Sequence, residues 1–398
     1  MANVVLGITG GIAAYKATAV IRLLTEAGHD VRVIPTANAL RFIGATTLEA
    51  LSHNSVDPDL YKDVADVKHV ELGQTADLVI VAPATAAFLA RYANGLADDL
   101  LLNTLLATKA PVLVAPAMHT EMWQHPTTIR NVSALRGDGV FVLEPAIGRL
   151  TGADSGQGRL PEPEVIVESA LRMLAPQDLE GKRVLVTAGG TREPIDPARF
   201  IGNYSSGRQG VELARAAARR GASVTLIAAN LADGQAAASI PGVHLIAAST
   251  AASMRGALEE CRTFADVLIY AAAVADYRVA TPTAAKLKRT DLGETMHLDL
   301  VQNPDLLAEA CNDRRESQVI VGFAAETATG MQLLNLATEK LRRKGCDLMV
   351  ANDVSAGAVF GSDDTSIMVL DQSGIVAEST GSKAAAANVV LDAVIARL

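Results

Sequence analysis

The fold is decided by residues 181–210, GKRVLVTAGGTREPIDPARFIGNYSSGRQG, because the pattern that opens the chain starts again there. The largely apolar run at 184–188 leads into Gly189-Gly190, just as the run at 4–8 leads into Gly10-Gly11. A short buried strand that breaks on a glycine pair before a helix is how open α/β sheets present backbone N–H groups to phosphate. A single loop of this kind is equally consistent with a tight turn that binds nothing. Two of them, each opening one half of the chain, predict two fused nucleotide-type domains.

Composition fits this division. At 398 residues the chain is too long for one core, so we expect two domains, at 1–177 and 178–398. A net charge of −9 without a long basic run argues against a nucleic acid partner. No apolar stretch is long enough for a membrane span, and no charged segment precedes a signal-type apolar core. We therefore expect a cytoplasmic protein with no membrane partner.

The cysteines are few and lie late in the chain. Cys261, Cys311 and Cys346 are too widely spaced for a disulfide framework or a zinc site. No cysteine precedes Cys261, so the first half has no thiol for chemistry.

The first half alternates strands and helices. We expect a helix at 12–27, ended by Gly28, and strands at 4–8, 31–34, 78–81 and 112–114. The last two strands run into Ala-Pro-Ala, at 82–84 and 115–117, where proline is expected to stop the ladder. Such sheet-top loops are where open α/β sheets bind ligands. Ordinary strand exits are the alternative, but the Thr, Met and His residues that follow favour a site.

The glycine loop does not fit an NAD site. Residues 7–12 read GITGGI, which is not G-x-G-x-x-G, and Pro35-Thr36 stand where an acidic residue should close the second strand. A two-domain NAD(P) reductase therefore lacks its ribose-binding group.

Three segments of the first half resemble the FMN-dependent cysteine decarboxylases: GGIAAYK at 10–16, APAT at 82–85 and PAMHTEMW at 116–123. The resemblance implies a flavodoxin-like or Rossmann-like domain that binds FMN through Gly10, Gly11, Thr36, Thr85 and Met118. It also implies that His69 is a catalytic residue. Taken alone, His69 would more often be a surface or capping residue, but neutral imidazole is well suited to take a proton near neutral pH.

The first half departs from that family at two positions. His119 stands where the family usually has an asparagine that binds the substrate carboxylate, and Gly152 stands where many relatives have a cysteine that donates a proton. We hypothesise that the flap at 151–160 only excludes water, and that a nearby imidazole or a held water supplies the proton. His119 is the first candidate, and protonated His69 is the alternative donor. The alternative is that His119 simply replaces asparagine as a carboxylate ligand.

The second half restarts after a helix at 164–174 and a hinge at 176–178. We expect a parallel sheet with a hairpin at its edge. Its strands are expected at 184–187, 224–228, 267–270, 320–321 and 348–350, the hairpin at 366–378, and helices at 211–220 and 383–398.

Five features of the second half are candidates for binding. Asn203–Gly207 offers hydroxyl and N–H groups to phosphate, or is a simple helix cap. Small residues at 271–277 allow a planar ligand close to the backbone. The cations at 286–289 bind an anion or form a solvated face. Residues 322–327 offer an aromatic ring to a base, and Lys340 and Lys344 share one helix face.

These motifs closely resemble the CTP-dependent phosphopantothenate–cysteine ligases, and residues 3–398 as a whole resemble the bifunctional proteins of coenzyme A biosynthesis. The resemblance implies that CTP activates 4'-phosphopantothenate as an acyl-cytidylate, with release of pyrophosphate. L-cysteine then displaces CMP. The first half would oxidise the cysteinyl thiol, release CO₂ and return the electrons, so that 4'-phosphopantetheine forms without net redox change. Mg²⁺ is expected with CTP, because the triphosphate charge needs a bridging cation.

The resemblance also assigns residues. Catalytic roles fall to His69, His119, Asn203 and Lys286, and substrate contacts to Arg199, Asn203 and His119. Contacts to CTP are expected from Asp276, Lys286, Asn303, Pro304, Asp305, Leu306, Phe323, Lys340 and Lys344. Arg289 stands where lysine is common.

The metal ligands remain unassigned, and the implied assembly is a homo-dodecamer of flavin-domain trimers and ligase-domain dimers. A regulatory flavoprotein of the same fold is the alternative, and it would not need His69.

Overall fold

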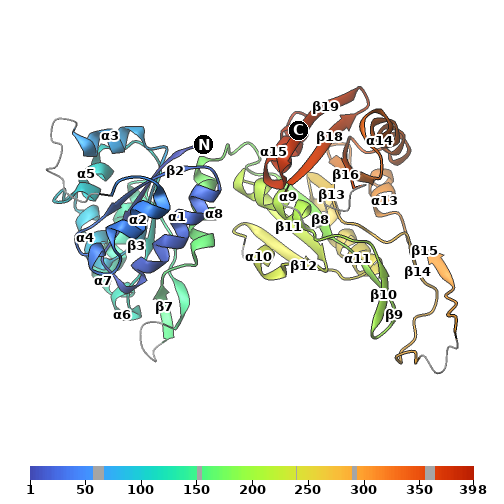
Figure 1. Ribbon diagram of the computed structural model, residues 1–398, viewed down its shortest axis with the longest axis horizontal. Helices are drawn as coiled ribbons and strands as arrows, with labels where there is room; N and C mark the ends of the chain where they lie inside the picture. Colours follow the sequence, from blue (N-terminus) through green and yellow to red (C-terminus); the bar gives the residue numbers. More distant parts are fainter. Residues whose placement is uncertain (57–66, 150–154, 239, 289–293, 355–363) are drawn as a thin grey trace. The chain divides into compact units, whose positions relative to one another are not determined.

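The structure is a computed structural model that describes residues 1–56, 67–149, 155–238, 240–288, 294–354 and 364–398. Gly152 and Arg289 lie outside the described residues. The chain forms two compact units, Met1–Ala175 and Pro176–Leu398, each built on its own sheet (Figure 1). Within the described residues, no helix is long and apolar enough to cross a membrane.

The first unit is a parallel sheet in the order β2-β1-β3-β4-β5. Its strands are β1 (Asn3–Ile8), β2 (Asp30–Pro35), β3 (Leu78–Ala84), β4 (Val112–Pro116) and β5 (Phe141–Val142). Strands β3 and β4 are buried along their whole length, as expected for strands covered on both faces. This is the flavodoxin-like order, in which the winding direction reverses between β1 and β3, and a ligand crevice is expected at that point. The predicted fold class is confirmed.

Helices cover both faces of this sheet. One face packs against α1 (Ala17–Glu26), α2 (Ala45–Ser52) and α8 (Pro163–Leu174). The other packs against α4 (Ala86–Ala93), α5 (Leu100–Ala107) and α7 (Pro126–Gly137). Helix α3 (Lys68–Thr75) lies on α5, where a Cβ at Gly73 would be 2.9 Å from the Thr104 carbonyl oxygen. The short helix α6 (Thr120–Trp123) contacts β7 (Ser155–Arg159), which pairs with β6 (Ala146–Arg149).

Two local predictions for this unit were wrong in detail. The segment expected to be one helix begins as a 3-10 turn, η1 (Ile12–Lys16), before α1. The prolines of the Ala-Pro-Ala segments do not stop the ladder, since β3 continues to Ala84 and β4 to Pro116. Proline lacks only the donor, and the Pro83 carbonyl still accepts hydrogen bonds from the Thr9 N–H at 3.2 Å and the Thr9 hydroxyl at 2.8 Å.

The second unit contains a larger, mixed sheet in the order β12-β11-β8-β13-β16-β17-β18-β19. The strands are β8 (Arg183–Gly189), β11 (Ser223–Ala229), β12 (Val243–Ala247), β13 (Val267–Tyr270), β16 (Val319–Glu326), β17 (Leu348–Asp353), β18 (Asp364–Asp371) and β19 (Gly374–Ser382). The first six in this order are parallel and follow the doubly wound arrangement, with the reversal between β8 and β13. Strands β18 and β19 add the expected antiparallel edge hairpin.

Helices α9 (Arg208–Arg219) and α15 (Lys383–Ile395) cover one face of this sheet. Helices α11 (Ala251–Cys261), α13 (Leu306–Asn312) and α14 (Gly330–Lys344) cover the other, and α10 (Gly234–Ala238) lies beside β12. The buried Arg220 joins the start of the unit to its last helix, because its guanidinium lies 2.6 Å from both Asp178 and Asp392.

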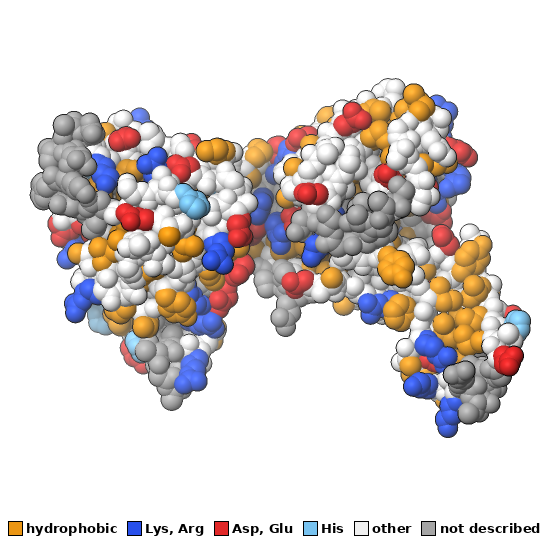
Figure 2. All heavy atoms as spheres, in the orientation of Figure 1, with side chains coloured by type: hydrophobic (Ala, Val, Ile, Leu, Met, Phe, Trp, Pro, Cys, Tyr) orange, Lys and Arg blue, Asp and Glu red, His pale blue; other side chains and the backbone are white. Residues whose placement is uncertain are grey.

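An arm projects from this sheet (Figure 1). We define it as β9 (Arg192–Asp196), β10 (Arg199–Gly202), β14 (Tyr277–Val279), β15 (Leu300–Gln302) and the described residues between β14 and β15. Strands β9 and β10 form one antiparallel pair, β14 and β15 another, and β14 contacts β9. The arm exposes apolar side chains that form the cluster seen on it in Figure 2. The exposed large apolar residues of the arm include Phe200, Tyr277, Met296, Leu300 and Val301.

Candidate active sites

The first unit has a cavity of about 470 Å³ at the carboxyl ends of its central strands. Turn η1, the β3–α4 junction, the start of α6 and β7 supply its walls. Gly11, Thr85, Met118 and His119 line it, together with the apolar side chains Ile12, Tyr15 and Met122. These three are highly exposed for residues of their type, at 62%, 60% and 47%, because they face the cavity. The structure thus brings together three of the residues predicted to bind FMN, with His119, which was predicted to contact the substrate.

A threonine fixes the geometry of this cavity. The Thr9 hydroxyl donates to the Pro83 carbonyl at 2.8 Å and accepts from the Thr85 N–H at 3.0 Å, so it joins the ends of β1 and β3. A Cβ at Gly10 would lie 2.4 Å from the Cβ of Asn38, so this glycine is required by the chain that follows β2. Gly11 has open space on its cavity side, with the nearest atom at 3.5 Å.

Strand β7 closes the cavity by docking on the β4–α6 loop. The Met118 N–H donates to the Gly158 carbonyl at 3.0 Å. Gly158 has a φ of +152°, and a Cβ there would lie 2.2 Å from the Met118 carbonyl oxygen. A Cβ at Gly156 would lie 2.3 Å from the Thr120 hydroxyl. The glycines in the described part of the flap therefore allow it to lie directly against His119 and its neighbours.

Three predicted residues are not part of the cavity lining. Gly10 packs against Asn38. Thr36 makes hydrogen bonds to neighbouring chain segments, because its N–H donates to the Ile8 carbonyl and its hydroxyl accepts from the Ala39 N–H. His69 is on α3, and Figure 1 shows α3 at the end of the unit opposite α6 and β7.

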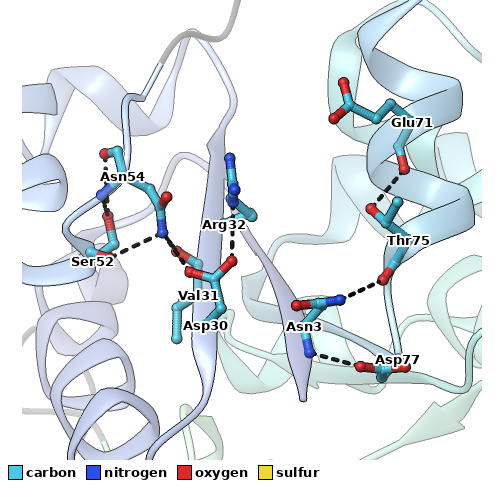
Figure 3. Close-up of polar contacts among 9 residues, drawn as sticks. All are labelled: Asn3, Asp30, Val31, Arg32, Ser52, Asn54, Glu71, Thr75 and Asp77. Atoms are coloured by element: carbon cyan, nitrogen blue, oxygen red, sulfur yellow. Dashed lines mark hydrogen bonds and ion pairs between the residues drawn. The ribbon is translucent and has the colours of Figure 1, made fainter. Parts of the chain in front are cut away.

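The chain just after α3 is tied to the start of β1, at the amino-terminal edge of the sheet. Asn3 donates from its backbone N–H to Asp77 at 2.7 Å and from its side chain to the Thr75 carbonyl at 3.2 Å (Figure 3). Figure 3 also shows Asn54, which donates to Asp30 at 2.8 Å and fastens the chain after α2 to β2 at the same edge. His69 and His119 are therefore not neighbours within one chain.

The second unit has two adjoining cavities at the carboxyl ends of its strands. The larger, about 350 Å³, lies between the start of α9, the loop after β13 and the ends of β16 and β17. The smaller, about 270 Å³, lies between that same loop, the turn at 303–307 and α14. Both are lined by Asp276, Phe323 and Lys340, so they form one continuous site. Asn203 lines the larger cavity only; Lys344 and the predicted residues Asn303, Pro304, Asp305 and Leu306 line the smaller.

Close packing of glycines shapes this site too. Gly189 has a φ of +84°, and a Cβ there would lie 1.8 Å from the Ala229 carbonyl oxygen. A Cβ at Gly190 would lie 2.7 Å from the Asn203 carbonyl oxygen. Thr191 joins β8 to the loop after β13, because its N–H donates to the Ala273 carbonyl at 3.2 Å and its hydroxyl accepts from the Ala275 N–H at 3.0 Å.

Helix α14 contributes three of the basic residues that line the site, Lys340, Arg343 and Lys344. Burial lowers the pKa of Lys340 and of Lys344, and nearby carboxylates oppose that effect. The Lys340 ammonium lies 3.9 Å from Glu326, and Lys344 forms an ion pair with Asp305. Partly desolvated cations at one end of a cavity are suited to bind an anion such as a phosphate chain. A phosphate bound to Lys344 would compete with Asp305 for its ammonium group.

The two asparagines predicted in this unit have different environments. Asn203 is exposed, and its amide donates to the Val274 carbonyl at 3.2 Å. Asn303 is buried and holds the loop after β13, because its backbone N–H donates to the Asp276 carbonyl and its amide to the Ala275 carbonyl, both at 2.8 Å. Asn303 therefore shapes the site by internal hydrogen bonds.

Comparison with known proteins shows the family to which the chain belongs. A family model described as Flavoprotein matches residues 1–175, and one described as DNA/pantothenate metabolism flavoprotein C-terminal domain matches residues 179–398. The coenzyme A biosynthesis bifunctional protein CoaBC of Mycobacterium tuberculosis (strain ATCC 25618 / H37Rv) is 53% identical over 406 residues, which cover 99% of this chain and 96% of that protein. The chain belongs to the CoaBC family.

Other members of the CoaBC family align over a similar extent. The protein of the same name from Bacillus subtilis (strain 168) is 43% identical, over 94% of this chain and 91% of that protein. A crystal structure of the C-terminal domain of a CoaBC protein is 30% identical and covers 55% of this chain and 97% of that chain, with a TM-score of 0.45.

Two residues assigned by resemblance to the CoaBC family lie outside both cavities of the second unit. Lys286 is exposed on the arm. Arg199, on β10, donates through its guanidinium to Asp196 at 2.6 Å and to the Leu287 carbonyl at 2.5 Å. Within the part of the chain that the structure describes, no cluster of three or more His, Cys, Asp or Glu side chains is placed to hold a metal ion.

Gln209 is among the polar lining residues of this CoaBC site that sequence reasoning missed. Gln209, on the first turn of α9, lines the larger cavity, and both polar atoms of its amide are buried without a hydrogen-bond partner. Its position two residues after the glycine of Ser-Ser-Gly was the available signal.

Proposed function

We propose that this CoaBC-family protein performs two consecutive steps of coenzyme A biosynthesis, a CTP-dependent ligation at 178–398 and an FMN-dependent decarboxylation at 1–177. The observation that carries the proposal is that each unit has its own cavity at the winding reversal of its own parallel sheet. The two linings differ, since the first is largely apolar with a few cations and the second contains both acidic and basic side chains.

The first-unit cavity suits a flavin. Its volume of about 470 Å³ lies within the usual range of small-molecule sites, and it combines apolar walls with an open backbone edge at Gly11. We propose that Gly10, Gly11, Thr36, Thr85 and Met118 hold FMN. When bound, FMN supplies a reversible two-electron acceptor, which makes loss of a carboxyl group β to sulfur feasible without net oxidation. His119 lies at the cavity wall, where it can bind the substrate carboxylate or donate a proton, and β7 shields the site from water.

The second-unit site suits a nucleotide beside an acyl group. A carboxylate is a poor acyl donor until it carries a leaving group, and CTP provides one. We propose that Lys340 and Lys344 bind the triphosphate, with Mg²⁺ bridging its charges, while Phe323 contacts the base. Asn203, in the adjoining cavity, would hold the acyl-cytidylate of 4'-phosphopantothenate until the amine of L-cysteine displaces CMP.

We also propose a homo-oligomer with trimeric first units and dimeric second units, a dodecamer in total. The exposed apolar cluster on the arm supports a paired contact of second units, since patches of this kind mark interaction surfaces. Lys286 lies outside both cavities of its own unit, so its contact with CTP requires an arm that moves or an arm from the dimer partner.

The proposal is tested on the full-length protein by its flavin absorbance and by two product assays. CTP-dependent pyrophosphate release should require 4'-phosphopantothenate, and CO₂ release should require phosphopantothenoylcysteine. A coloured protein that released neither product would instead be a regulatory flavoprotein. A colourless protein without pyrophosphate release would overturn the proposal for both units.

A further inference from the structure

The basic segment of the arm is fastened to the β9–β10 hairpin by one ion pair. The carboxylate of Asp196 accepts the Leu287 N–H at 3.1 Å, and the guanidinium of Arg199 donates to the Leu287 carbonyl at 2.5 Å. Both backbone polar groups of one residue are thus bound by two side chains that also bind each other, at 2.6 Å. A second attachment lies four residues earlier, where the backbone N–H and hydroxyl of Thr283 donate to the Ile195 carbonyl at 3.0 and 3.2 Å.

We call the three mutually bound residues Asp196, Arg199 and Leu287 the clamp. Asp196 anchors it. Its side chain has no exposed surface, and it accepts backbone N–H groups from Ala198 at 2.7 Å and from Arg199 at 2.8 Å, which closes the turn between β9 and β10. Arg199 adds donors from Nε at 2.9 Å and Nη2 at 2.6 Å. Burial by itself raises the pKa of Asp196, but these hydrogen bonds, with that of Leu287, lower it to about 2. The carboxylate therefore stays charged throughout the physiological range.

The clamped segment has little else to define its shape. Residues 281–288 form no helix or strand, and Lys286 and Lys288 are exposed on either side of the half-buried Leu287. A segment without its own hydrogen-bond ladder loses conformational freedom only through attachments of this kind. The position of Lys286 thus depends on Asp196 and Arg199.

We propose that Asp196 and Arg199 are positioning residues that fix Lys286 on the arm, so that it can contact the triphosphate of CTP when the arm moves or when the arm belongs to the dimer partner. The proposal rests on the ligase function proposed above. It gives Arg199 a role different from the one that family resemblance implies, since Arg199 acts through Leu287 and not on the substrate phosphate.

The experiment compares Asp196→Ala and Arg199→Lys in the full-length protein with wild type and with Arg192→Lys. Arg192 is a matched control on the same hairpin, where its guanidinium lies over the Phe200 ring at 4.8 Å and takes no part in the clamp. The first readout is independent of activity: hydrogen exchange of peptides covering 280–288, and trypsin cleavage after Lys286 and Lys288. The second is the split between KM and kcat for CTP and for 4'-phosphopantothenate, with CO₂ release as the folding control.

We expect both clamp variants to accelerate exchange and cleavage of 280–288 and to raise the KM for CTP by roughly tenfold or more, since charge-assisted hydrogen bonds are lost. Arg199→Lys keeps the charge, but an ammonium cannot bind Asp196 and the Leu287 carbonyl with the planar geometry of a guanidinium. This variant should therefore not retain the wild-type exchange rate or the wild-type KM for CTP. Unchanged exchange would overturn the clamp. Faster exchange with an unchanged KM for CTP, or a rise only in the KM for 4'-phosphopantothenate, would overturn the positioning role. If wild type releases no CTP-dependent pyrophosphate, the ligase function fails instead, and the exchange data still decide on the clamp.

Discussion

The two units share the structure of the loop after their first strand but differ in the residues that line their cavities. In each, the first strand runs into a glycine pair, and a threonine hydroxyl next to that pair accepts an N–H from the chain that follows the strand across the winding reversal. Thr9 accepts from Thr85, and Thr191 accepts from Ala275. In each, a glycine leaves room for the chain at or after the end of the adjacent strand, near Asn38 in one case and Ala229 in the other. The glycine loops therefore allow neighbouring chain segments to pack closely, and they do not by themselves specify a ligand.

The difference lies in what is placed around these loops. The first-unit cavity is lined mainly by apolar side chains and backbone, and its charged lining residues are the cations Lys16, Arg149 and Arg159. The second-unit site has acidic as well as basic lining residues, with ion pairs of Lys340 with Glu326 and of Lys344 with Asp305. An apolar cavity selects a ligand by shape, and a charged one selects by complementary charge. Both units thus use the same doubly wound arrangement, and the residues that follow the strands determine which reaction each unit suits.

The largest effect is expected at His69. His69→Asn should lower decarboxylation by roughly 10²–10⁴ while leaving bound FMN and pyrophosphate release unchanged. Because α3 lies far from the cavity of its own chain, we predict that a neighbouring copy supplies His69.

Mixed oligomers test that prediction. Gly11→Phe fills the cavity from a position whose φ of −159° any residue adopts, so this variant should also be inactive in decarboxylation. Oligomers reassembled from His69→Asn and Gly11→Phe chains should regain activity, whereas oligomers with both changes in the same chain should not. No recovery in the mixture would show that His69 acts within its own chain or not at all. Lys68→Gln is the neighbouring control.

The next effect concerns the proton donor of the first unit, which has no cysteine. If His119 donates the proton, His119→Asn should slow formation of the saturated aminothiol by roughly 10²-fold and allow the unsaturated enethiol to accumulate. Product identification by mass spectrometry makes the distinction. A raised KM with no enethiol would identify His119 as a carboxylate ligand only.

A smaller effect is expected in the charged site. Lys344→Ala should weaken CTP binding by about 10–150-fold and reduce its dependence on salt, because a hydrogen bond to a charged group is lost. Decarboxylation of supplied phosphopantothenoylcysteine should not change. Arg342→Ala, at an exposed position of the same helix, is the control. Equal loss of both activities would contradict the separation of the two sites.

The smallest effect is a change in stability confined to the second unit. A hydrogen bond from Arg220 lowers the pKa of Asp178, so the pair stabilises the folded state above pH about 4 and is lost as pH falls further. Asp178→Asn should cost about 1 kcal/mol at neutral pH, with a smaller difference from wild type at pH about 3, since Asp178 is partly exposed. Calorimetry should show that only one of two transitions shifts. A shift in both would contradict the independence of the units.

Sequence reasoning found those parts of the fold that depend on local pattern. The buried strand Val267–Tyr270 has the predicted bounds, because four consecutive large apolar residues stand between Asp266 and the small residues that begin at Ala271. The convergence of Asp276, Phe323 and Lys340 was expected from family resemblance. The meeting of the carboxyl ends of parallel strands at one edge accounts for Asp276 and Phe323, whereas Lys340 comes from α14.

The remainder depends on contacts between distant residues. Strands β14 and β15 have only three residues each and exist because they pair with each other. The clamp joins Asp196 to Leu287, residues that are 91 positions apart, so no local pattern could assign Arg199 to the arm. The placement of His69 away from its expected cavity likewise follows from the attachment of α3 at the other edge of the sheet.

The central claim is that two sites in one chain act independently and in sequence. The most direct measurement removes the flavin from the full-length protein and follows pyrophosphate and CO₂ in the same sample supplied with CTP, 4'-phosphopantothenate and L-cysteine. The account predicts unchanged pyrophosphate release, accumulation of phosphopantothenoylcysteine and no CO₂ until FMN is restored. Loss of pyrophosphate release together with the flavin, or CO₂ release without it, would contradict the account.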